Sequence, residues 1–473
     1  MKRRNFILTG SLGAAGLGIT ACNREGRPES RKEIPGIPSD PPKYKSMKSA
    51  HGKPVLGSND KIVLALIGAG GWGTNLVVRL ARMKENIEFK YVCDVDDTRG
   101  GRAISELGKF QGYDPERVRD MRKVFDDGDV DAVMISTPEH WHALATVWAC
   151  QAGKDVYVEK CISHNLTEGQ KMAEAANKYE RVVQSGHQNR NADYVRQARN
   201  YIAGGKLGDI VNITVDELLP GPVPFNEKES GNAPDTIDWD LWLGPAPKVP
   251  YNVSRNKSWF YYWEYGGGKA MTNECIHQLD MTRIILGDPG MPESVISFGG
   301  RTLFDDNRDT PDFLTSTFDY GDFTINLRAG EFAPYMEKVS TEVRYSDVLF
   351  PDWNNLGTKV VIYGTEGMMM IGRMGGGWQV FGNEGKLVDQ ATGLFPLNDH
   401  MQNFLDCVRS RETPNGDIIQ AHMSSALLHY ANMSHRLGSE KLNVDPDTER
   451  VVNNENALAL ENGTYRPGFE IVV

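Results

Sequence analysis

The sequence lacks several features that would place it in a specialised class of protein. Beyond the first 22 residues, no segment has the ~18 apolar residues that a membrane-spanning helix needs. The six cysteines form no Cys-x-x-Cys pair, and their spacing is not that of a disulfide framework. The formal net charge of −11 makes a nucleic-acid partner unexpected, and no internal repeat is present. What is left is a globular chain of 473 residues, long enough for two domains.

The N-terminus has the pattern of a bacterial export signal. A positive segment, Lys2-Arg3-Arg4, precedes a small-residue apolar stretch that is too short to span a bilayer. The arginine pair followed by Phe6 resembles a twin-arginine signal, and Ile19-Thr20-Ala21-Cys22 resembles a lipobox that would lipidate Cys22. The alternative is an ordinary secretory signal with a coincidental cysteine. We expect residues 1–22 to be the signal of an exported periplasmic or cell-envelope lipoprotein. Residues 23–58, rich in Pro, Lys, Ser and Gly, would form a flexible tether.

A glycine-rich segment follows the first strand-like run, Ile62 to Ile67. It reads Gly68, Ala69, Gly70, Gly71, Trp72, Gly73. Gly68 permits a tight turn, Gly70 lets the backbone approach a pyrophosphate, and Gly73 lets a helix pack on the strand. The phosphates would then lie at a helix N-terminus, where the dipole favours negative charge. The pattern predicts a dinucleotide site, and a glycine turn without a ligand is the alternative.

Asp94 indicates which dinucleotide is bound. It ends a second strand-like run, Phe89 to Cys93, and follows Gly73 by 21 residues. A carboxylate there bonds a ribose 2′-hydroxyl and repels a 2′-phosphate. We therefore expect NAD rather than NADP, although Arg99 and Arg102 lie nearby and could receive a phosphate.

The predicted secondary structure divides the chain after its N-terminal segment into two regions. Strand-like and helix-like segments alternate through residues 59–185, which predicts an α/β Rossmann domain with a doubly wound parallel sheet. From residue 186 onward, strand-like runs follow one another with few helices between them. Residues 186–473 are therefore expected to form an α+β substrate-binding domain with a large, mostly antiparallel open sheet.

Two further segments carry groups suited to proton transfer. Glu159-Lys160 ends a parallel strand, on the side where such sheets bind ligands. A lysine there can polarise a substrate hydroxyl, whereas a solvated surface ion pair is the alternative. In the second segment, Gly266 to Asp280, a glycine turn leads into a helical pattern that places Asn273 and His277 on one face. An imidazole can accept the proton of an alcohol.

Taken together, these motifs resemble the glucose–fructose oxidoreductase, inositol dehydrogenase and MocA (Gfo/Idh/MocA) family. The similarity extends from Lys61 to about Val444. It rests on the motifs above and on three more: Thr137-Pro138 with His142, Gly186-His187-Gln188-Asn189-Arg190, and Trp242-Leu243-Gly244-Pro245. The resemblance implies that Lys160 and His277 are the catalytic pair and that Asn273, Asn189 and Arg190 contact substrate. The cofactor residues that it implies are Gly68, Gly70, Gly71, Trp72, Gly73, Asp94, Thr137, Pro138, His142, Glu159 and Lys160.

Three positions depart from the family pattern. Cys161 replaces the usual proline after Lys160, Asn273 replaces the usual aspartate, and Cys275 replaces the usual glycine. Asparagine can donate and accept hydrogen bonds but carries no charge. Cys161 and Cys275 could line the active site, and with His187 they would suggest a metal. Their spacing matches no metal-binding pattern, so we expect small buried thiols and no metal.

The function expected from the resemblance is the NAD-dependent oxidation of a hydroxyl on a sugar, glycoside or polyol. Because free NAD is scarce outside the cytoplasm, an exported member would hold its cofactor tightly and recycle it internally. One alternative is an NAD-dependent glycosidase that works by oxidation, elimination and reduction. A second is a non-catalytic exported sugar-binding protein. A homo-oligomer built through the C-terminal sheet is also expected.

Overall fold

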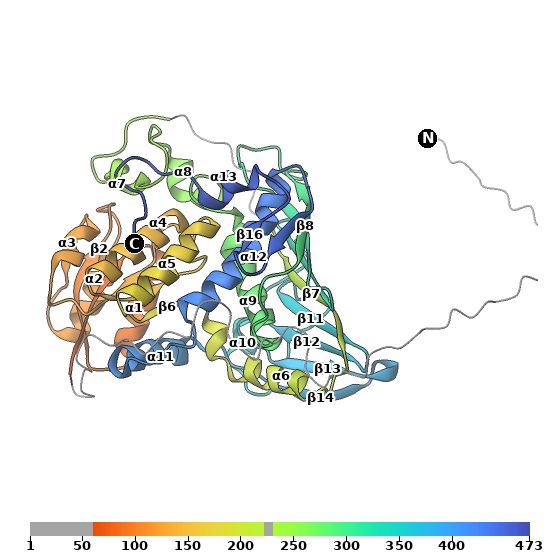
Figure 1. Ribbon diagram of the computed structural model, residues 1–473. Coiled ribbons are helices and arrows are strands. Elements are labelled where there is room, and N and C mark those ends of the chain that lie inside the picture. The colour runs from red at the N-terminus through yellow and green to blue at the C-terminus, as the bar shows by residue number, and fades with distance from the viewer. Residues whose placement is uncertain (1–59, 222–229) are drawn as a thin grey trace, which may run out of the picture.

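The molecule is built on two β-sheets, each covered by helices (Figure 1). The computed structural model describes residues 60–221 and 230–473. The proposed signal, Cys22 and the whole of the proposed tether lie outside the described residues. None of the described helices is both long enough and apolar enough to cross a bilayer.

The first sheet has six strands in the order β3-β2-β1-β4-β5-β6, and every neighbouring pair is parallel. Its strands are β1 (Ile62–Ile67), β2 (Ile87–Cys93), β3 (Glu116–Val118), β4 (Ala132–Ile135), β5 (Asp155–Val158) and β6 (Val183–Ser185). The connecting helices are α1 (Gly71–Arg82), α2 (Gly101–Gln111), α3 (Met121–Asp126), α4 (Glu139–Gln151) and α5 (Leu166–Lys178). The predicted doubly wound Rossmann sheet is confirmed. The short segments α2, β3 and α3 were not among the expected elements.

The second sheet has ten strands in the order β14-β13-β12-β11-β7-β10-β9-β8-β15-β16. They are β7 (Ile210–Leu218), β8 (Ser294–Gly300), β9 (Phe313–Asp319), β10 (Thr324–Gly330), β11 (Lys359–Gly364), β12 (Met368–Gly372), β13 (Trp378–Phe381), β14 (Leu387–Ala391), β15 (Leu442–Asp445) and β16 (Arg450–Val451). Only the β7–β10 pair is parallel, so the predicted, mostly antiparallel sheet is also confirmed.

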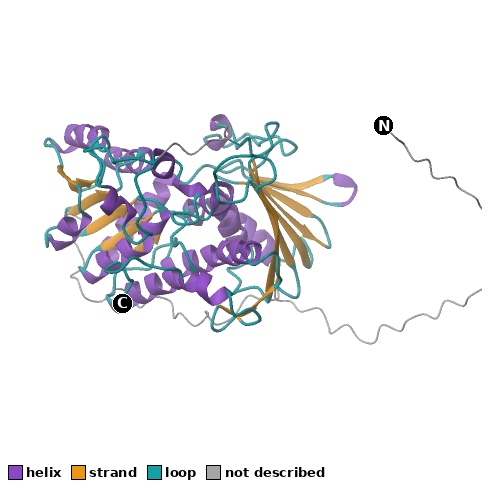
Figure 2. Ribbon diagram, turned by 90° about the horizontal axis from the view of Figure 1, so that it is seen from above, coloured by secondary structure: helices purple, strands orange, loops and turns teal. Residues whose placement is uncertain are grey.

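Helices cover one face of this second sheet, as Figure 2 shows. Side chains from α6 (Asp193–Ala203), α9 (Ile276–Ile285) and α12 (Ile418–Arg436) form one apolar core with the inner face of the strands. The other described helices are α7 (Trp239–Leu243), α8 (Val253–Lys257), α10 (Thr341–Arg344), α11 (Leu397–Ser410) and α13 (Ala457–Asn462).

The C-terminal half of the chain contributes to both domains. Phe404 and Val408 of α11 are buried in the core beneath the Rossmann sheet. Ile471, near the C-terminus, is buried against the other face of the same sheet, and Figure 1 shows this end beside α4 and α5. Residues of α11 and of the C-terminus thus pack on opposite faces of the Rossmann sheet and connect the two domains.

Candidate active site

A cavity of about 540 Å³ lies at the carboxyl ends of the parallel strands. It is the place where ligands bind in open α/β sheets. From the first domain it is lined by the glycine-rich turn, Asp94, Thr137, Pro138, His142, Glu159 and Lys160. From the second domain it is lined by Asn273, Glu274, His277, Lys338, Arg344 and Arg373. The structure thus brings every predicted cofactor residue to one cavity, together with the predicted catalytic pair.

The glycine-rich turn has the geometry that a pyrophosphate requires. Gly68 has φ +88°, and a Cβ there would lie 2.5 Å from the carbonyl oxygen of Ser136. A Cβ on Gly73 would lie 2.3 Å from the carbonyl oxygen of Gly68. By contrast, no atom lies within 4 Å of the Cβ position of Gly71, at the first turn of α1. The backbone at the helix N-terminus is therefore open to a phosphate, and the residues present fit a dinucleotide.

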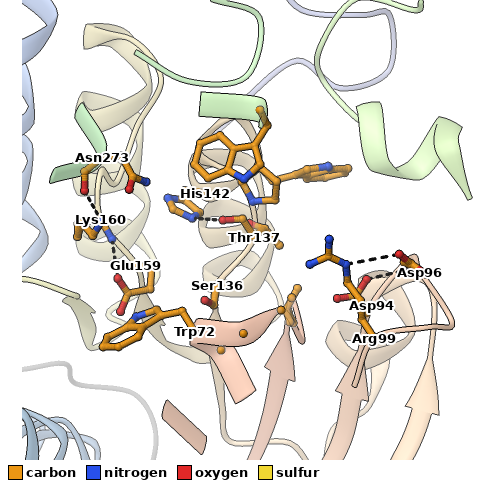
Figure 3. A pocket seen from close by; sticks show the side chains of 18 of the residues that line it. Trp72, Asp94, Asp96, Arg99, Ser136, Thr137, His142, Glu159, Lys160 and Asn273 are labelled. Carbon is orange, nitrogen blue, oxygen red and sulfur yellow. Dashed lines mark hydrogen bonds and ion pairs between the residues drawn. The ribbon is translucent and has the colours of Figure 1, made fainter. Parts of the chain in front are cut away.

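Asp94 lies at the end of β2 and faces this cavity. One carboxylate oxygen accepts a hydrogen bond from the amide of Ala69 at 2.8 Å, and the other accepts one from the amide of Asp96 at 2.9 Å. Each oxygen has a further lone pair for a ribose hydroxyl. Arg99 lines the cavity but forms an ion pair with Asp96 at 3.4 Å, and Arg102 is not among the lining residues (Figure 3).

Glu159 directly follows β5 and lines the cavity. Tyr157 donates a hydrogen bond from its hydroxyl to Oε1 of Glu159 at 3.3 Å, and Trp72 lies beside the carboxylate (Figure 3). Burial raises the pKa of Glu159, while Lys160 and the Trp72 indole oppose that effect. A Cβ on Gly186 would come within 2.8 Å of this carboxylate, which explains the glycine in that motif.

Lys160 extends from the end of β5 toward the second domain. Its Nζ donates a hydrogen bond to the carbonyl oxygen of Asn273 (Figure 3). His142 supports this arrangement, because its ring nitrogens lie 2.8 Å from the carbonyl oxygen of Thr137 and 2.6 Å from that of Cys161. The ring of His142 therefore lies between the ends of β4 and β5. Burial lowers its pKa to about 4, so the neutral ring donates to one of these two carbonyl oxygens.

His277 lies in the first turn of α9, and its side chain is 5% exposed. Burial lowers the pKa of His277 well below the usual value, and the positive charges of Arg373 and Lys160 lower it further. The imidazole is therefore neutral near pH 7, as a general base must be. Its ring lines the cavity and makes no hydrogen bond to another described side chain or carbonyl.

The helix expected after the glycine turn in the segment Gly266 to Asp280 is only partly correct. Gly268–Cys275 is a π-helix, and α9 starts at Ile276. π-helical turns are rare and are often found at functional sites. Asn273 belongs to the π-helical part and His277 to α9, so the regular i, i+4 argument does not apply, yet both residues still line the cavity.

Four charged residues of the substrate end were not predicted from the sequence. Glu274 forms ion pairs with Lys338 at 3.0 Å and with Arg373 at 2.9 Å, and Arg373 also pairs with Glu217 at 3.2 Å. Burial opposes ionisation of Glu274, but Arg373, Lys160 and Lys338 outweigh it and hold its pKa well below the usual value. Arg344, at the end of α10, completes the set. These residues carry no local motif, which is why sequence patterns did not reveal them.

Two predicted substrate ligands are not brought to the cavity. Asn189 is buried, the side chain of Arg190 is 5% exposed, and neither residue lines the cavity. The guanidinium of Arg190 bonds Asp280 at 3.0 Å and Asp288 at 3.1 Å. The side-chain amide of Asn189 donates to the carbonyl oxygen of His277 at 3.5 Å. Both residues thus support α9 on the side away from the cavity. Their sequence motif does not show how deeply a side chain is buried.

The cysteines of the site region are buried thiols. All five cysteines in the described part of the chain are free and buried. Cys161 and Cys275 do not line the cavity, and burial raises the pKa of Cys161 to about 12. His187 has Nδ1 at 2.8 Å from the hydroxyl of Ser185. Among the residues the structure describes, no group of three His, Cys, Asp or Glu side chains is arranged to hold a metal.

Comparison with known proteins agrees with this geometry. The model of the GFO/IDH/MocA oxidoreductase family, NAD-binding Rossmann fold, matches residues 62–187. The model of that family's C-terminal alpha/beta domain matches residues 194–318.

Curated relatives match over about a third of the chain. Inositol 2-dehydrogenase from Salmonella typhimurium is 31% identical over 144 residues, which are 30% of this chain and 42% of that protein. Levoglucosan dehydrogenase from Pseudarthrobacter phenanthrenivorans is 26% identical over 178 residues, 38% of each chain. A glycosyl hydrolase family 109 protein from Shewanella putrefaciens is 26% identical over 176 residues, 35% of this chain and 38% of that protein. The matched segments therefore span less than half the length of these relatives.

Solved structures share the fold over most of the chain. A levoglucosan dehydrogenase in complex with NADH and levoglucosan has a TM-score of 0.57 at 16% identity, covering 81% of this chain and 99% of that one. The WlbA dehydrogenase from Bordetella pertussis, in complex with NADH and UDP-GlcNAcA, has a TM-score of 0.59 at 17% identity, covering 82% and 99%. With the two family models matching both domains, the chain belongs to the GFO/IDH/MocA oxidoreductase family and carries its NAD-binding Rossmann domain.

Proposed function

We propose that this protein is an NAD-dependent oxidoreductase that oxidises a hydroxyl group of a sugar, glycoside or polyol. One observation carries the proposal: the glycine-rich turn, Lys160 and His277 line the same cavity, although they come from two domains. Relatives named inositol 2-dehydrogenase and levoglucosan dehydrogenase support the substrate class.

The side chains divide the work of proton transfer. The imidazole of His277 accepts the hydroxyl proton, because its lowered pKa keeps the ring neutral near pH 7. Lys160 is held by the carbonyl oxygen of Asn273 and donates a second hydrogen bond to the substrate oxygen, stabilising the negative charge that develops there. When bound, NAD supplies the acceptor for the hydride. The glycine turn, Asp94 and Glu159 would hold it.

The direct test starts with the purified protein. Nucleotide released on denaturation is identified, and the NAD-loaded protein is then screened with free sugars, glycosides and polyols for the absorbance of reduced nicotinamide. Release of NAD and its reduction by at least one sugar are expected. A protein that binds sugars but never reduces its nucleotide would instead be a binding protein.

We further propose that the cofactor is retained and recycled within each catalytic cycle. The support is the signal-like N-terminus, because an exported enzyme meets little free NAD. Tight retention acts mainly through a slow off-rate. After extensive dialysis, pairs of sugars should sustain turnover without added nucleotide. Activity that stops after one equivalent and returns only with free NAD would refute recycling.

Export and lipidation at Cys22 are proposed on the sequence pattern alone. Replacing Cys22 with serine should abolish incorporation of labelled fatty acid and release the protein from the membrane fraction. Labelled Cys22→Ser protein would contradict the lipobox assignment.

A second candidate activity is supported by the glycosyl hydrolase family 109 relative. Such an enzyme would oxidise a glycoside, release its aglycone by elimination, and reduce the product with the same cofactor. Chromogenic glycosides distinguish the two activities, because only the glycosidase releases the chromophore without net reduction of NAD.

We also propose that the protein assembles through the face of the second sheet opposite its helices. Phe298 of β8 and Tyr363 of β11 are 55% and 41% exposed on that face, because they alternate with residues that point into the core. The solution mass should exceed that of one chain and fall to it when both residues become aspartate. A wild-type monomer would contradict this.

A further inference from the structure

The substrate end of the cavity contains a cation that no described carboxylate neutralises. Arg373 lies between Glu217 and Glu274, and Lys338 shares Glu274. Arg344 has no carboxylate of the described residues within ion-pair distance. Its Nε donates to the carbonyl oxygen of Val339 at 2.9 Å, so the rest of the guanidinium fork is left for a ligand.

The surroundings of Arg344 make this charge unfavourable without a ligand. Its side chain is half-buried and lines the cavity. Burial and the neighbouring Arg373 lower the pKa of Arg344, and they outweigh the opposite effect of the more distant Glu274 carboxylate. Uncompensated charges at partly buried positions are costly, and an anionic ligand removes that cost.

Building on the proposed function, we propose that Arg344, assisted by Lys338, binds a carboxylate carried by the substrate, so that the substrate class is acidic sugars such as uronic acids. Arginine binds carboxylates through two parallel hydrogen bonds, which fix the orientation of the sugar as well as its affinity. Lys338 stands 3.0 Å from Glu274, the residue next to Asn273, and therefore connects the carboxylate subsite to the catalytic end of the cavity.

The phosphates of the cofactor are the other source of negative charge in this cavity. The open backbone at Gly71 already offers the helix N-terminus to them. Arg344 lies near Glu274 and Arg373, and it also lines a smaller cavity beside Trp72 and Asn75 of α1. The two sources predict different behaviour of an Arg344 variant toward nucleotide and sugar.

The test measures binding to the NAD-loaded full chain by calorimetry. The probes are D-glucuronate and D-galacturonate, compared with D-glucose and D-galactose. At least one acid should bind roughly tenfold or more tightly than its neutral partner. Arg344→Gln should remove that advantage, whereas Arg344→Lys should keep part of it. Neither change should alter the dissociation constant of NAD. Arg196→Gln, on the exposed side of α6, is the matched control and should behave as wild type.

Two results would overturn the proposal. Acids that bind no better than the neutral sugars would remove the carboxylate subsite. An Arg344→Gln variant that loses NAD affinity while sugar selectivity is unchanged would assign Arg344 to the cofactor phosphates. Because binding needs no turnover, the proposed function can fail separately: uronates that bind through Arg344 without ever reducing the nicotinamide would refute the oxidoreductase and retain the subsite.

Discussion

The two ends of the cavity recognise their ligands in different ways. The cofactor end is made by main-chain groups and glycines of one segment, Gly68 to Gly73, with Asp94 a short distance along the chain. The substrate end is made by long charged side chains: Glu274, Lys338 and Arg373 are held by mutual ion pairs, and Lys160 is held by the carbonyl oxygen of Asn273. Backbone geometry tolerates few changes, whereas side chains can be exchanged one at a time. Cofactor choice should therefore be the rigid property of this fold and sugar choice the adjustable one.

The largest effect is expected where the two ends meet. His277→Ala removes the proton acceptor and Lys160→Ala removes the group that stabilises the developing alkoxide. Each should lower the rate of the chemical step by roughly a hundredfold or more, while NAD binding is preserved. Single-turnover kinetics on NAD-loaded protein measures this. Near-normal turnover in either variant would refute the role assigned to that residue.

The rigidity of the cofactor end can be tested at Gly68. Gly68→Ala places a Cβ 2.5 Å from the carbonyl oxygen of Ser136 in a backbone with φ +88°. We expect a loss of roughly 1–3 kcal/mol in the free energy of unfolding and about tenfold or more in NAD affinity. Gly128→Ala is the control, since no atom lies within 4 Å of its Cβ position. Equal behaviour of the two variants, by melting and nucleotide titration, would show that the turn is not constrained.

Cofactor preference should change by a smaller amount. Asp94→Ala removes the carboxylate that faces the ribose, so NAD should bind several-fold more weakly and NADP should lose little. The measurement compares dissociation constants for both nucleotides with those of Asp126→Asn, a variant of an exposed position at the end of α3. Nucleotide extracted from wild-type protein that is mainly NADP would show that Asp94 does not select the ribose.

The smallest effect concerns pH at the substrate end. The pKa of His277 lies well below its usual value, so the acid limb of kcat/KM that His277 causes should lie below pH 6.5. Lys338→Gln removes a nearby cation and frees the charge of Glu274. Both changes favour the imidazolium, so the pKa of His277 should rise and the limb should move upward by about half a pH unit. If the limb moves downward or does not move, the charge of Lys338 does not lower the pKa of His277.

How much of the site could be predicted depended on how local its signals were. The cofactor end was predictable because a glycine turn, a strand and an acid occur in a fixed order over 27 residues, Gly68 to Asp94. Lys160 and His277 were identified by family resemblance, and both line the cavity. Both sheets were also predicted, because the alternation of strands and helices is a local property. The short elements α2, β3 and α3 were missed.

The rest could not be predicted, since it depends on long-range packing. Arg344 ends α10 and Arg373 follows β12, both far from Lys160 in sequence, and no spacing connects them. Asn189 and Arg190 were predicted to contact substrate because a sequence motif does not show how deeply a side chain is buried. In the structure they pack behind α9 instead. The π-helix before Ile276 has no sequence pattern that distinguishes it from an α-helix.

The central claim is that hydride leaves a carbon of a sugar in the cavity that holds His277. The most direct measurement supplies the NAD-loaded protein with a sugar identified in the screen, carrying deuterium on the carbon of the reacting hydroxyl, and analyses the extracted nucleotide by mass spectrometry. The account predicts reduced nicotinamide that carries the deuterium in wild type, and unlabelled, oxidised nucleotide still bound in His277→Ala. Unlabelled nicotinamide in wild type, or equal labelling in both proteins, would contradict it.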